Sequence, residues 1–253
     1  MRSSIERRGK MKVLCIGNSF SQDATRYLHQ IAEAAGENIK VFNLYIGGCS
    51  LERHWNNIEN SLAEYLLEVN GESTGQYVTS EEMLQKEDWD VVTLQQVSQC
   101  SVDYATYQPY LEKIDAFVRK KAPMAKRFLH QTWAYAQDSP RLTEMLKYRT
   151  QEEMYRDLEA AYQKAWQAIQ ADGMIPSGKT FREVQLKTKI GMYRDGFHAS
   201  LGIGRYVLGL TWYGYLTGKS VKEIPYVLLD EPAKETELQE AAAAVETVLQ
   251  SVK

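Results

Sequence analysis

The feature that most constrains the fold is a short apolar strand that stops at a glycine and leads directly into a serine-bearing helix. The run Val13-Leu14-Cys15-Ile16 is apolar enough for a buried strand, and Gly17-Asn18-Ser19-Phe20 follows it at once. A buried strand that turns straight into a helix is typical of α/β proteins with a parallel sheet. The first turn of the helix would hold Ser19 where free backbone N–H groups create a positive end.

Strands and helices alternate along the rest of the chain. We expect strands at 11–16, 39–46, 89–95, 126–131 and 174–176, which predicts a five-stranded parallel sheet covered by helices on both faces. Segment 65–79 contains Asn70-Gly71 and could be an edge hairpin or a lid. Residues 1–10 are basic and polar, so we expect a disordered extension there and a single domain over 11–253.

Composition excludes several classes of protein. The net charge of −3 gives no basic surface for nucleic acid, and no stretch reaches the ~18 apolar residues of a membrane span. The three cysteines, Cys15, Cys49 and Cys100, match no metal-binding spacing and suit a reducing compartment. We therefore expect a cytoplasmic protein without a metal, and the sequence leaves the oligomeric state open.

A second pattern lies far downstream, where residues 195–198 read Asp-Gly-Phe-His. His198 is expected to open a helix over 198–216, and Asp195 could fix its ring so that one nitrogen accepts a serine proton. A serine at a helix N-terminus is often just a cap, but Ser21 is an equally good cap and leaves Ser19 free. These residues predict an acyl-transfer site with Ser19 as nucleophile, His198 as base and Asp195 as the orienting acid.

Polar and aromatic side chains follow the third and fourth expected strands. Gln95 and Gln96 come after the third, and the segment from His130 to Trp133 follows the fourth. Because parallel strands end at one edge of a sheet, these side chains should gather near Ser19. With Tyr193, we expect His130 and Trp133 to form a substrate-binding surface suited to a sugar, although plain packing would explain the aromatic residues equally well.

Three of these short motifs together resemble the sequence blocks of a known hydrolase family. Residues 17–21, Gly-Asn-Ser-Phe-Ser, resemble the first sequence block of the SGNH (GDSL-like) hydrolases. Gly48, within Ile-Gly-Gly-Cys-Ser, looks like the glycine of the second block, and Asp195-x-x-His198 matches the last block. The blocks occur in family order over residues 11–216, and the whole looks most like an uncharacterised bacterial branch of the superfamily.

The resemblance implies a flavodoxin-like, three-layer α/β/α fold with a five-stranded parallel sheet. It implies Ser19 as nucleophile, His198 as general base and acid, and Asp195 as the residue that orients His198. It also implies an oxyanion hole built from the backbone N–H groups of Ser19 and Gly48 together with a side-chain amide. It implies no metal and no organic cofactor.

One block departs from the family pattern. The family usually has Gly-x-Asn-Asp after its third strand, whereas this chain has Leu-Gln-Gln-Val-Ser at 94–98. This resembles the Gln-Gly-Glu variant of sialate and acetylxylan esterase relatives, so we predict Gln95, or else Gln96, as the third oxyanion donor. The expected function is a serine esterase that removes small acyl groups such as acetyl from a carbohydrate-like substrate. The alternatives are a lipase- or thioesterase-type acyl hydrolase and a degenerate member that binds sugar.

Overall fold

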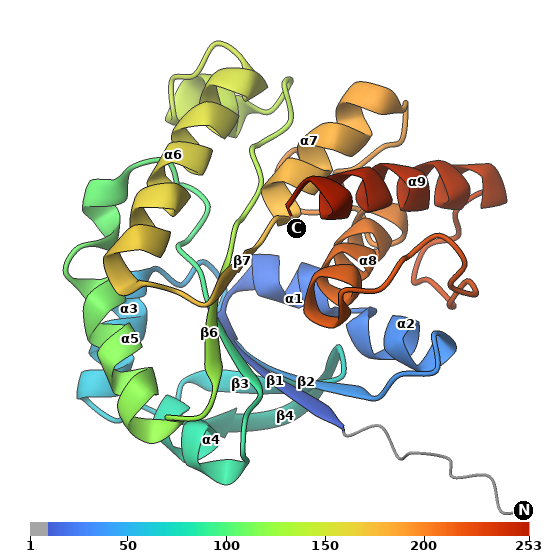
Figure 1. Cartoon of the computed structure of the whole chain (residues 1–253). Coiled ribbons are helices and arrows are strands. Elements are labelled where there is room, and N and C mark those ends of the chain that lie inside the picture. The colour runs from blue at the N-terminus through green and yellow to red at the C-terminus, as the bar shows by residue number, and fades with distance from the viewer. Residues whose placement is uncertain (1–9, 253) are drawn as a thin grey trace, which may run out of the picture.

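The computed structural model describes residues 10–252 and contains one seven-stranded sheet (Figure 1). The strand order across the sheet is β4-β3-β2-β1-β5-β6-β7. Five neighbouring strands, β2, β1, β5, β6 and β7, run parallel to one another. The strand bounds are β1 Met11–Gly17, β2 Ile39–Tyr45, β3 Tyr65–Val69, β4 Glu72–Val78, β5 Val91–Leu94, β6 Lys126–His130 and β7 Gly173–Ile175.

The five predicted strands are all present and form the parallel part of the sheet, but the predicted number of strands is wrong. Segment 65–79 adds β3 and β4, which form a hairpin antiparallel to β2 at the edge of the sheet. Asn70 and Gly71 form its turn with φ values of 54° and 82°, as a two-residue hairpin turn requires. The segment is therefore an edge hairpin. The predicted N-terminal extension lies, apart from Lys10, outside the described residues.

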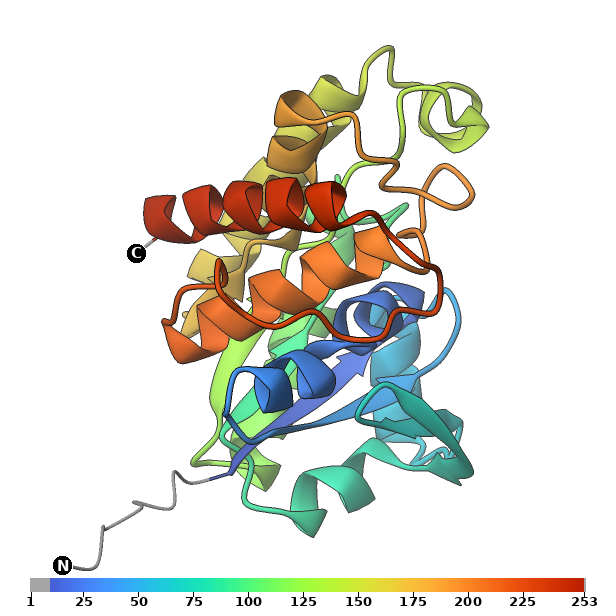
Figure 2. The same cartoon turned by 90° about the vertical axis from the view of Figure 1, so that its right-hand side faces the viewer.

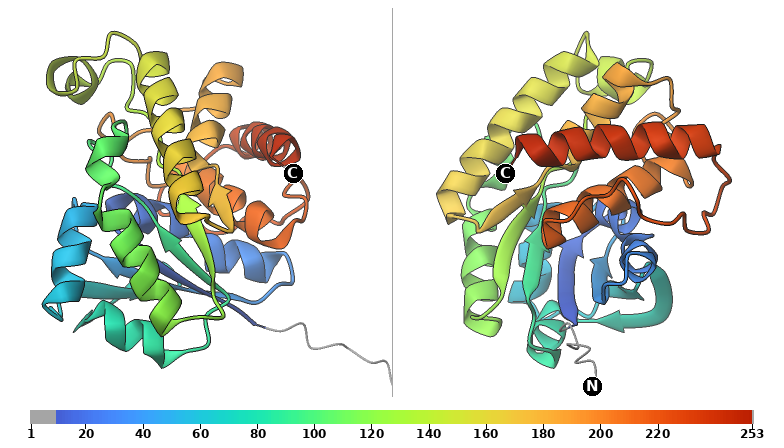
Figure 3. Two further views of the ribbon diagram at one scale, coloured as in Figure 1. Left: turned by 60° about the vertical axis from the view of Figure 1, so that its left-hand side comes forward. Right: turned by 45° about the vertical axis from the view of Figure 1, so that its right-hand side comes forward.

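Helices enclose the sheet in two layers (Figures 1 and 3). Alternating side chains of β1 supply both cores, because Val13 and Cys15 pack into one core and Leu14 and Ile16 into the other. Figure 2 shows α8 and α9 lying over α1 and α2. The first layer holds α1 Ser19–Thr25, α2 Leu28–Ala34, α7 Ser177–Lys187, α8 Ile203–Thr217 and α9 Glu235–Ser251, and the second holds α3 Leu51–Glu59, α4 Ser80–Lys86, α5 Tyr110–Lys121 and α6 Gln151–Ile169. Short helical turns occur at Tyr104–Tyr107 and Arg141–Met145.

Two helix starts differ from the prediction. α1 begins at Ser19 with Asn18 as its cap, because Asn18 Oδ1 accepts a hydrogen bond from Phe20 N at 3.0 Å; the predicted cap, Ser21, lies inside the helix. α8 begins at Ile203, so the prediction that His198 opens a helix is wrong and His198 lies in the preceding loop. No helix in residues 10–252 is long and apolar enough to cross a membrane.

The strand order places the ends of β1 and β5 at the point where the chain changes direction across the sheet. β1 is flanked by β2 and β5, with Gly17 opposite Tyr45 and Ile16 opposite Leu94. Ligands of open α/β sheets bind beyond the carboxyl ends of the strands at this switch point. The residues after β1 and β5 therefore form the natural place for a site.

Candidate active site

Ser19 is held by the turn between β1 and α1. Gly17 must be a glycine, since a Cβ there would lie 2.2 Å from Ser21 Oγ. Asn18 has an extended backbone and caps the helix, which makes Ser19 its first residue. Ser19 is half-buried while its neighbours Asn18 and Phe20 are buried. The local sequence thus leaves the Ser19 hydroxyl at the N-terminal, positive end of the helix.

The structure brings Ser19, His198 and Asp195 into one hydrogen-bonded line. Ser19 Oγ lies 2.9 Å from His198 Nε2, and His198 Nδ1 lies 2.6 Å from Asp195 Oδ2. A carboxylate accepts at Nδ1, so the proton sits on that nitrogen and Nε2 is free to accept from the serine. The geometry therefore allows proton transfer from the hydroxyl to the ring.

The Asp195 carboxylate is kept ionised by its hydrogen bonds. Its Oδ1 accepts from the backbone N–H groups of His198 at 2.8 Å and Phe197 at 3.2 Å. Partial burial acts to raise the pKa of Asp195, but the hydrogen bonds from the His198 ring and the two backbone groups outweigh it and hold the pKa below its ordinary value. The acid can therefore stabilise a protonated His198 ring at neutral pH.

The loop that carries Asp195 and His198 is closed like a small hairpin. Arg194 N donates to His198 O at 3.2 Å, and Gly196 at its tip has a φ of +82°, which favours glycine. The segment after β6 holds the tip from outside: Ala136 N donates to Gly196 O and the Trp133 ring N–H to Phe197 O, both at 2.8 Å. These bonds fix the loop conformation.

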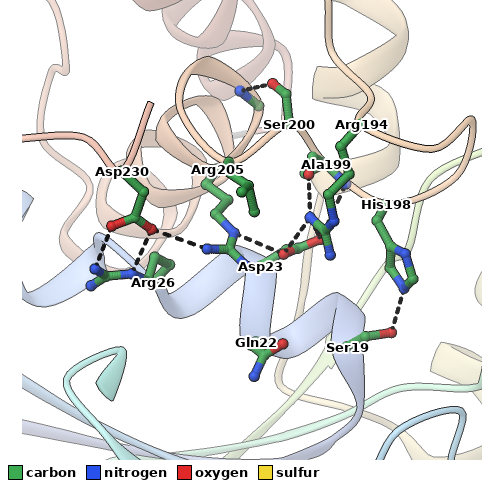
Figure 4. A network of polar contacts seen from close by, with 12 residues as sticks. Ser19, Gln22, Asp23, Arg26, Arg194, His198, Ala199, Ser200, Arg205 and Asp230 are labelled. Atoms are coloured by element: carbon green, nitrogen blue, oxygen red, sulfur yellow. Dashed lines mark hydrogen bonds and ion pairs between the residues drawn. The ribbon is translucent and has the colours of Figure 1, made fainter. Parts of the chain in front are cut away.

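Asp23 joins this loop to the helix of Ser19 (Figure 4). Its buried carboxylate accepts from Ala199 N at 3.1 Å, from Arg194 Nη1 at 3.0 Å and from Arg205 Nε at 2.8 Å. Arg205 also contacts Asp230 at 3.1 Å, which extends the network. The sequence analysis did not find this carboxylate; the available signals were its position four residues after Ser19 and the arginine directly before Asp195.

The predicted oxyanion residues occupy different environments. Gly48 is exposed, has a φ of +63° and lies in a turn closed by a bond from Cys49 N to Ile46 O. Asn18 Nδ2 donates to Cys49 O at 3.0 Å, which ties this turn to the start of α1. Gln95 is buried, and its Nε2 donates to Asn18 Oδ1 at 2.8 Å. The second N–H of the Gln95 amide takes no part in this bond.

Gln96 is built into the surrounding loops. Its Oε1 accepts from the backbone N–H groups of Leu51 at 3.0 Å and Val97 at 2.8 Å. Its Nε2 donates to the backbone oxygen of Thr106 at 2.9 Å and approaches the hydroxyl of the same residue. The Gln96 side chain is buried and its amide is already hydrogen-bonded, which favours Gln95 over Gln96 as the candidate for the third oxyanion donor.

The predicted substrate-binding surface is not formed by His130 and Trp133. Both side chains are 0 % exposed, so the expectation that they contact a substrate is wrong. Trp133 stacks between Phe20 and Phe181, with ring centroids 4.1 and 4.6 Å away. Residues at the strand ends near a switch point contribute to the hydrophobic core as well as to the site, and the side chains of His130 and Trp133 point into the core.

Tyr193 is half-buried and reaches a cavity. It lines a space of about 670 Å³ together with Asp195, but its hydroxyl already donates to Ala134 O at 2.7 Å. Three glutamines, Gln137, Gln151 and Gln185, line this cavity or its neighbour near α6 and α7. Within the part of the chain that the structure describes, no group of three or more His, Cys, Asp or Glu side chains is arranged to hold a metal ion.

Comparisons with known proteins agree with this fold. The chain matches the family described as "Domain of unknown function (DUF4886)" over residues 12–246. The crystal structure of a DUF4886 family protein from Bacteroides uniformis ATCC 8492 is 36% identical, covers 97% of both chains and has a TM-score of 0.89. Among curated proteins, no sequence matches this chain.

Two more distant structures carry SGNH or GDSL names. A candidate SGNH hydrolase from Slackia heliotrinireducens is 20% identical, with a TM-score of 0.60 over 82% of this chain and 100% of that one. A candidate GDSL-like lipase from Parabacteroides merdae ATCC 43184 is 15% identical, with a TM-score of 0.55 over 85% of this chain and 99% of that one. The chain therefore belongs to the DUF4886 family, and its fold is that of the SGNH hydrolases.

Proposed function

We propose that this protein is a serine esterase that removes small acyl groups, acetyl in the first place, from hydroxyl groups of a carbohydrate-like substrate. The observation that carries the proposal is the line from Ser19 Oγ through the His198 ring to Asp195, with contacts of 2.9 and 2.6 Å. A hydroxyl, an imidazole and a carboxylate in this order are what acyl transfer through a covalent intermediate needs.

In the proposed reaction, Ser19 Oγ attacks the acyl carbon while its proton passes to His198 Nε2. The oxygen of the tetrahedral intermediate takes hydrogen bonds from the backbone N–H groups of Ser19 and Gly48 and from the spare N–H of Gln95. His198 then protonates the departing alcohol as the acyl-enzyme forms. A water molecule then gives a proton to the same nitrogen and attacks the acyl carbon. The bond from the acyl carbon to Ser19 Oγ breaks, His198 returns the proton to Ser19 Oγ, and the acid leaves.

Three observations favour a small acyl group and a sugar as the substrate. Asn18 and Gln95 place polar amides beside the first turn of α1, where Ser19 lies, which favours a short acyl chain over a long one. An acetyl-xylooligosaccharide esterase from Geobacillus shares the fold with a TM-score of 0.50 at 15% identity. The three glutamines that line the neighbouring cavities carry amides of the kind that suits the hydroxyl groups of a sugar.

The test compares wild-type protein with Ser19→Ala and His198→Ala on p-nitrophenyl acetate. We expect both variants to lose at least about 10³-fold in kcat, since each removes one member of the line. Ser73→Ala on the exposed strand β4 is the matched serine control and should keep wild-type activity. Turnover by Ser19→Ala at the wild-type rate would refute the proposal.

Three further measurements address the nucleophile and the substrate. A fluorophosphonate probe should label wild-type protein at residue 19 and leave Ser19→Ala unlabelled, because labelling needs an activated serine. Rates along a series of p-nitrophenyl esters from acetyl to decanoyl should fall with chain length; a maximum at the long end would indicate a lipase or thioesterase instead. Acetate release from acetylated oligosaccharides then tests the sugar.

A further inference from the structure

A buried row of polar side chains runs beneath the candidate site, one from each neighbouring parallel strand. Asn18, Gln95 and His130 stand at the carboxyl ends of β1, β5 and β6, and Ser177 begins the helix after β7. All four are at most 2 % exposed. The row ends at the indole of Trp212 on α8. Such a row is costly to bury unless every group is hydrogen-bonded, so its arrangement should be unique.

The contacts along the row are short and continuous. Gln95 Nε2 donates to Asn18 Oδ1 at 2.8 Å, and Gln95 Oε1 lies 2.8 Å from His130 Nδ1. On its other side, His130 Nε2 lies 3.0 Å from Ser177 Oγ, which accepts from Trp212 Nε1 at 3.2 Å. His130 therefore links the glutamine to the far end of the row.

The direction of each hydrogen bond follows from the ends of the row. Asn18 Oδ1 is an acceptor, because Phe20 N donates to it, and Asn18 Nδ2 is a donor, because it points to Cys49 O. Gln95 must then turn its nitrogen toward Asn18 and its oxygen toward His130. An amide oxygen can only accept, so His130 carries its proton on Nδ1.

The remaining contacts agree with this tautomer. Burial lowers the pKa of His130 to about 3, so the ring is neutral at pH 7 and has one N–H. With that proton on Nδ1, Nε2 accepts from the Ser177 hydroxyl, whose oxygen accepts in turn from the Trp212 indole, which can only donate. The opposite tautomer would set a lone pair of Nδ1 against Gln95 Oε1.

We propose that His130 is a positioning residue which, through its Nδ1–H, keeps the Gln95 amide turned with its nitrogen toward Ser19. Gln95 Nε2 shares Asn18 Oδ1 with Phe20 N, so it lies at the first turn of α1, where Ser19 begins the helix. The inference rests on the proposed function, in which the second N–H of Gln95 faces the oxyanion. Without the donor at His130, the Gln95 amide keeps only its bond to Asn18 Oδ1 and loses the contact that holds its oxygen away from Ser19, so its nitrogen is held less firmly toward a developing negative charge.

A matched pair of substitutions tests the inference. In His130→Asn the amide nitrogen falls near the position of Nδ1 and can still donate to Gln95, whereas in His130→Gln the amide falls near Nε2 and contacts Ser177 instead. Each variant loses one of the two ring hydrogen bonds. A purely structural role predicts similar losses of activity in both.

We expect kcat for p-nitrophenyl acetate to fall about 10²–10³-fold in His130→Gln, the effect of removing one oxyanion donor. His130→Asn should stay within about tenfold of wild type, and KM should change little in either variant because the donor acts on the transition state. Equal kcat values in the two variants would overturn the inference.

The tautomer gives a second measurement that needs neither variant nor activity. Histidine ¹⁵N chemical shifts of the wild-type protein should place the His130 proton on Nδ1 from pH 5 to 8, within the neutral range set by its lowered pKa. A proton on Nε2 would overturn the inference even if neither variant folds. A wild-type protein inactive on every ester would instead refute the proposed function and leave the order of the hydrogen bonds standing.

Discussion

Asp23→Asn should separate the role of the Asp23 network from that of the reacting groups. The substitution keeps the side chain's shape but removes the charge that faces Arg194 and Arg205. Breaking a buried ion pair costs about 3–5 kcal/mol. We expect the lower end, about 3 kcal/mol, because Arg205 keeps its contact with Asp230 and the Arg194 side chain is 26% exposed and can be hydrated.

This loss has a measurable size in thermal unfolding. For a protein of this length, 1 kcal/mol corresponds to about 2–4 °C in Tm, so Asp23→Asn should unfold about 6–12 °C below wild type. The Ala199 N–H that follows His198 loses its ionised acceptor, so the loop should shift relative to Ser19. A displacement of 1 Å near the reacting atoms costs up to about 10² in rate, and we expect kcat/KM to fall between tenfold and that limit.

The matched control is Glu152→Gln, which also breaks a carboxylate–arginine pair, with Arg182 at 2.7 Å, but on the surface. Exposed pairs contribute about 0–1 kcal/mol, so its Tm and activity should stay close to wild type. The reasoning would be refuted if Asp23→Asn lowered Tm no more than Glu152→Gln and left kcat/KM unchanged.

The remaining predictions concern the acid and the thiols. Asp195→Asn should lower kcat by about 10³–10⁴-fold in the ester assay, since an amide cannot hold the His198 tautomer as a carboxylate does. Because folding lowers the pKa of Asp195, the ionised Asp195 carboxylate stabilises the folded protein fully above about pH 4, and this contribution is lost as the pH falls through the pKa of the folded state. The difference in Tm between wild type and Asp195→Asn should therefore narrow below about pH 4. A difference that widens there would contradict the assignment. Burial raises the pKa of Cys15 and Cys49 to about 12, so a thiol reagent on native protein should label the half-buried Cys100 first, as mass spectrometry of peptides would show; prompt labelling of Cys49 would count against the buried packing.

The sequence predicts the parts of the structure that depend on neighbouring residues. The apolar run before Gly17 marks β1, the Asn70-Gly71 pair marks the hairpin turn, and the spacing of Asp195 and His198 lets one side chain reach the other. Each of these signals lies within a few residues of what it determines, and the alternation of strands and helices adds the parallel sheet.

The features that the sequence did not predict depend on contacts between residues that are distant in the chain or on the backbone conformation. Asn18 and Ser21 are both good caps, and the backbone conformation decides for Asn18. His130 follows a strand as a site residue would, yet packing of Trp212 against its ring places it in the core. The contact of Asp23 with Arg194 spans 171 residues, and no local pattern announces it.

The order of the elements has a consequence for synthesis and proteolysis. All seven strands are complete by Ile175, whereas the loop that carries the imidazole and its carboxylate follows at 193–199. In a chain still emerging from the ribosome, all seven strands are made before the loop at 193–199, so under the proposed function Ser19 stays unactivated until that loop folds. By the same logic, a cut at 188–192 that released the C-terminal piece would leave all seven strands in one piece and Ser19 without the His198 ring.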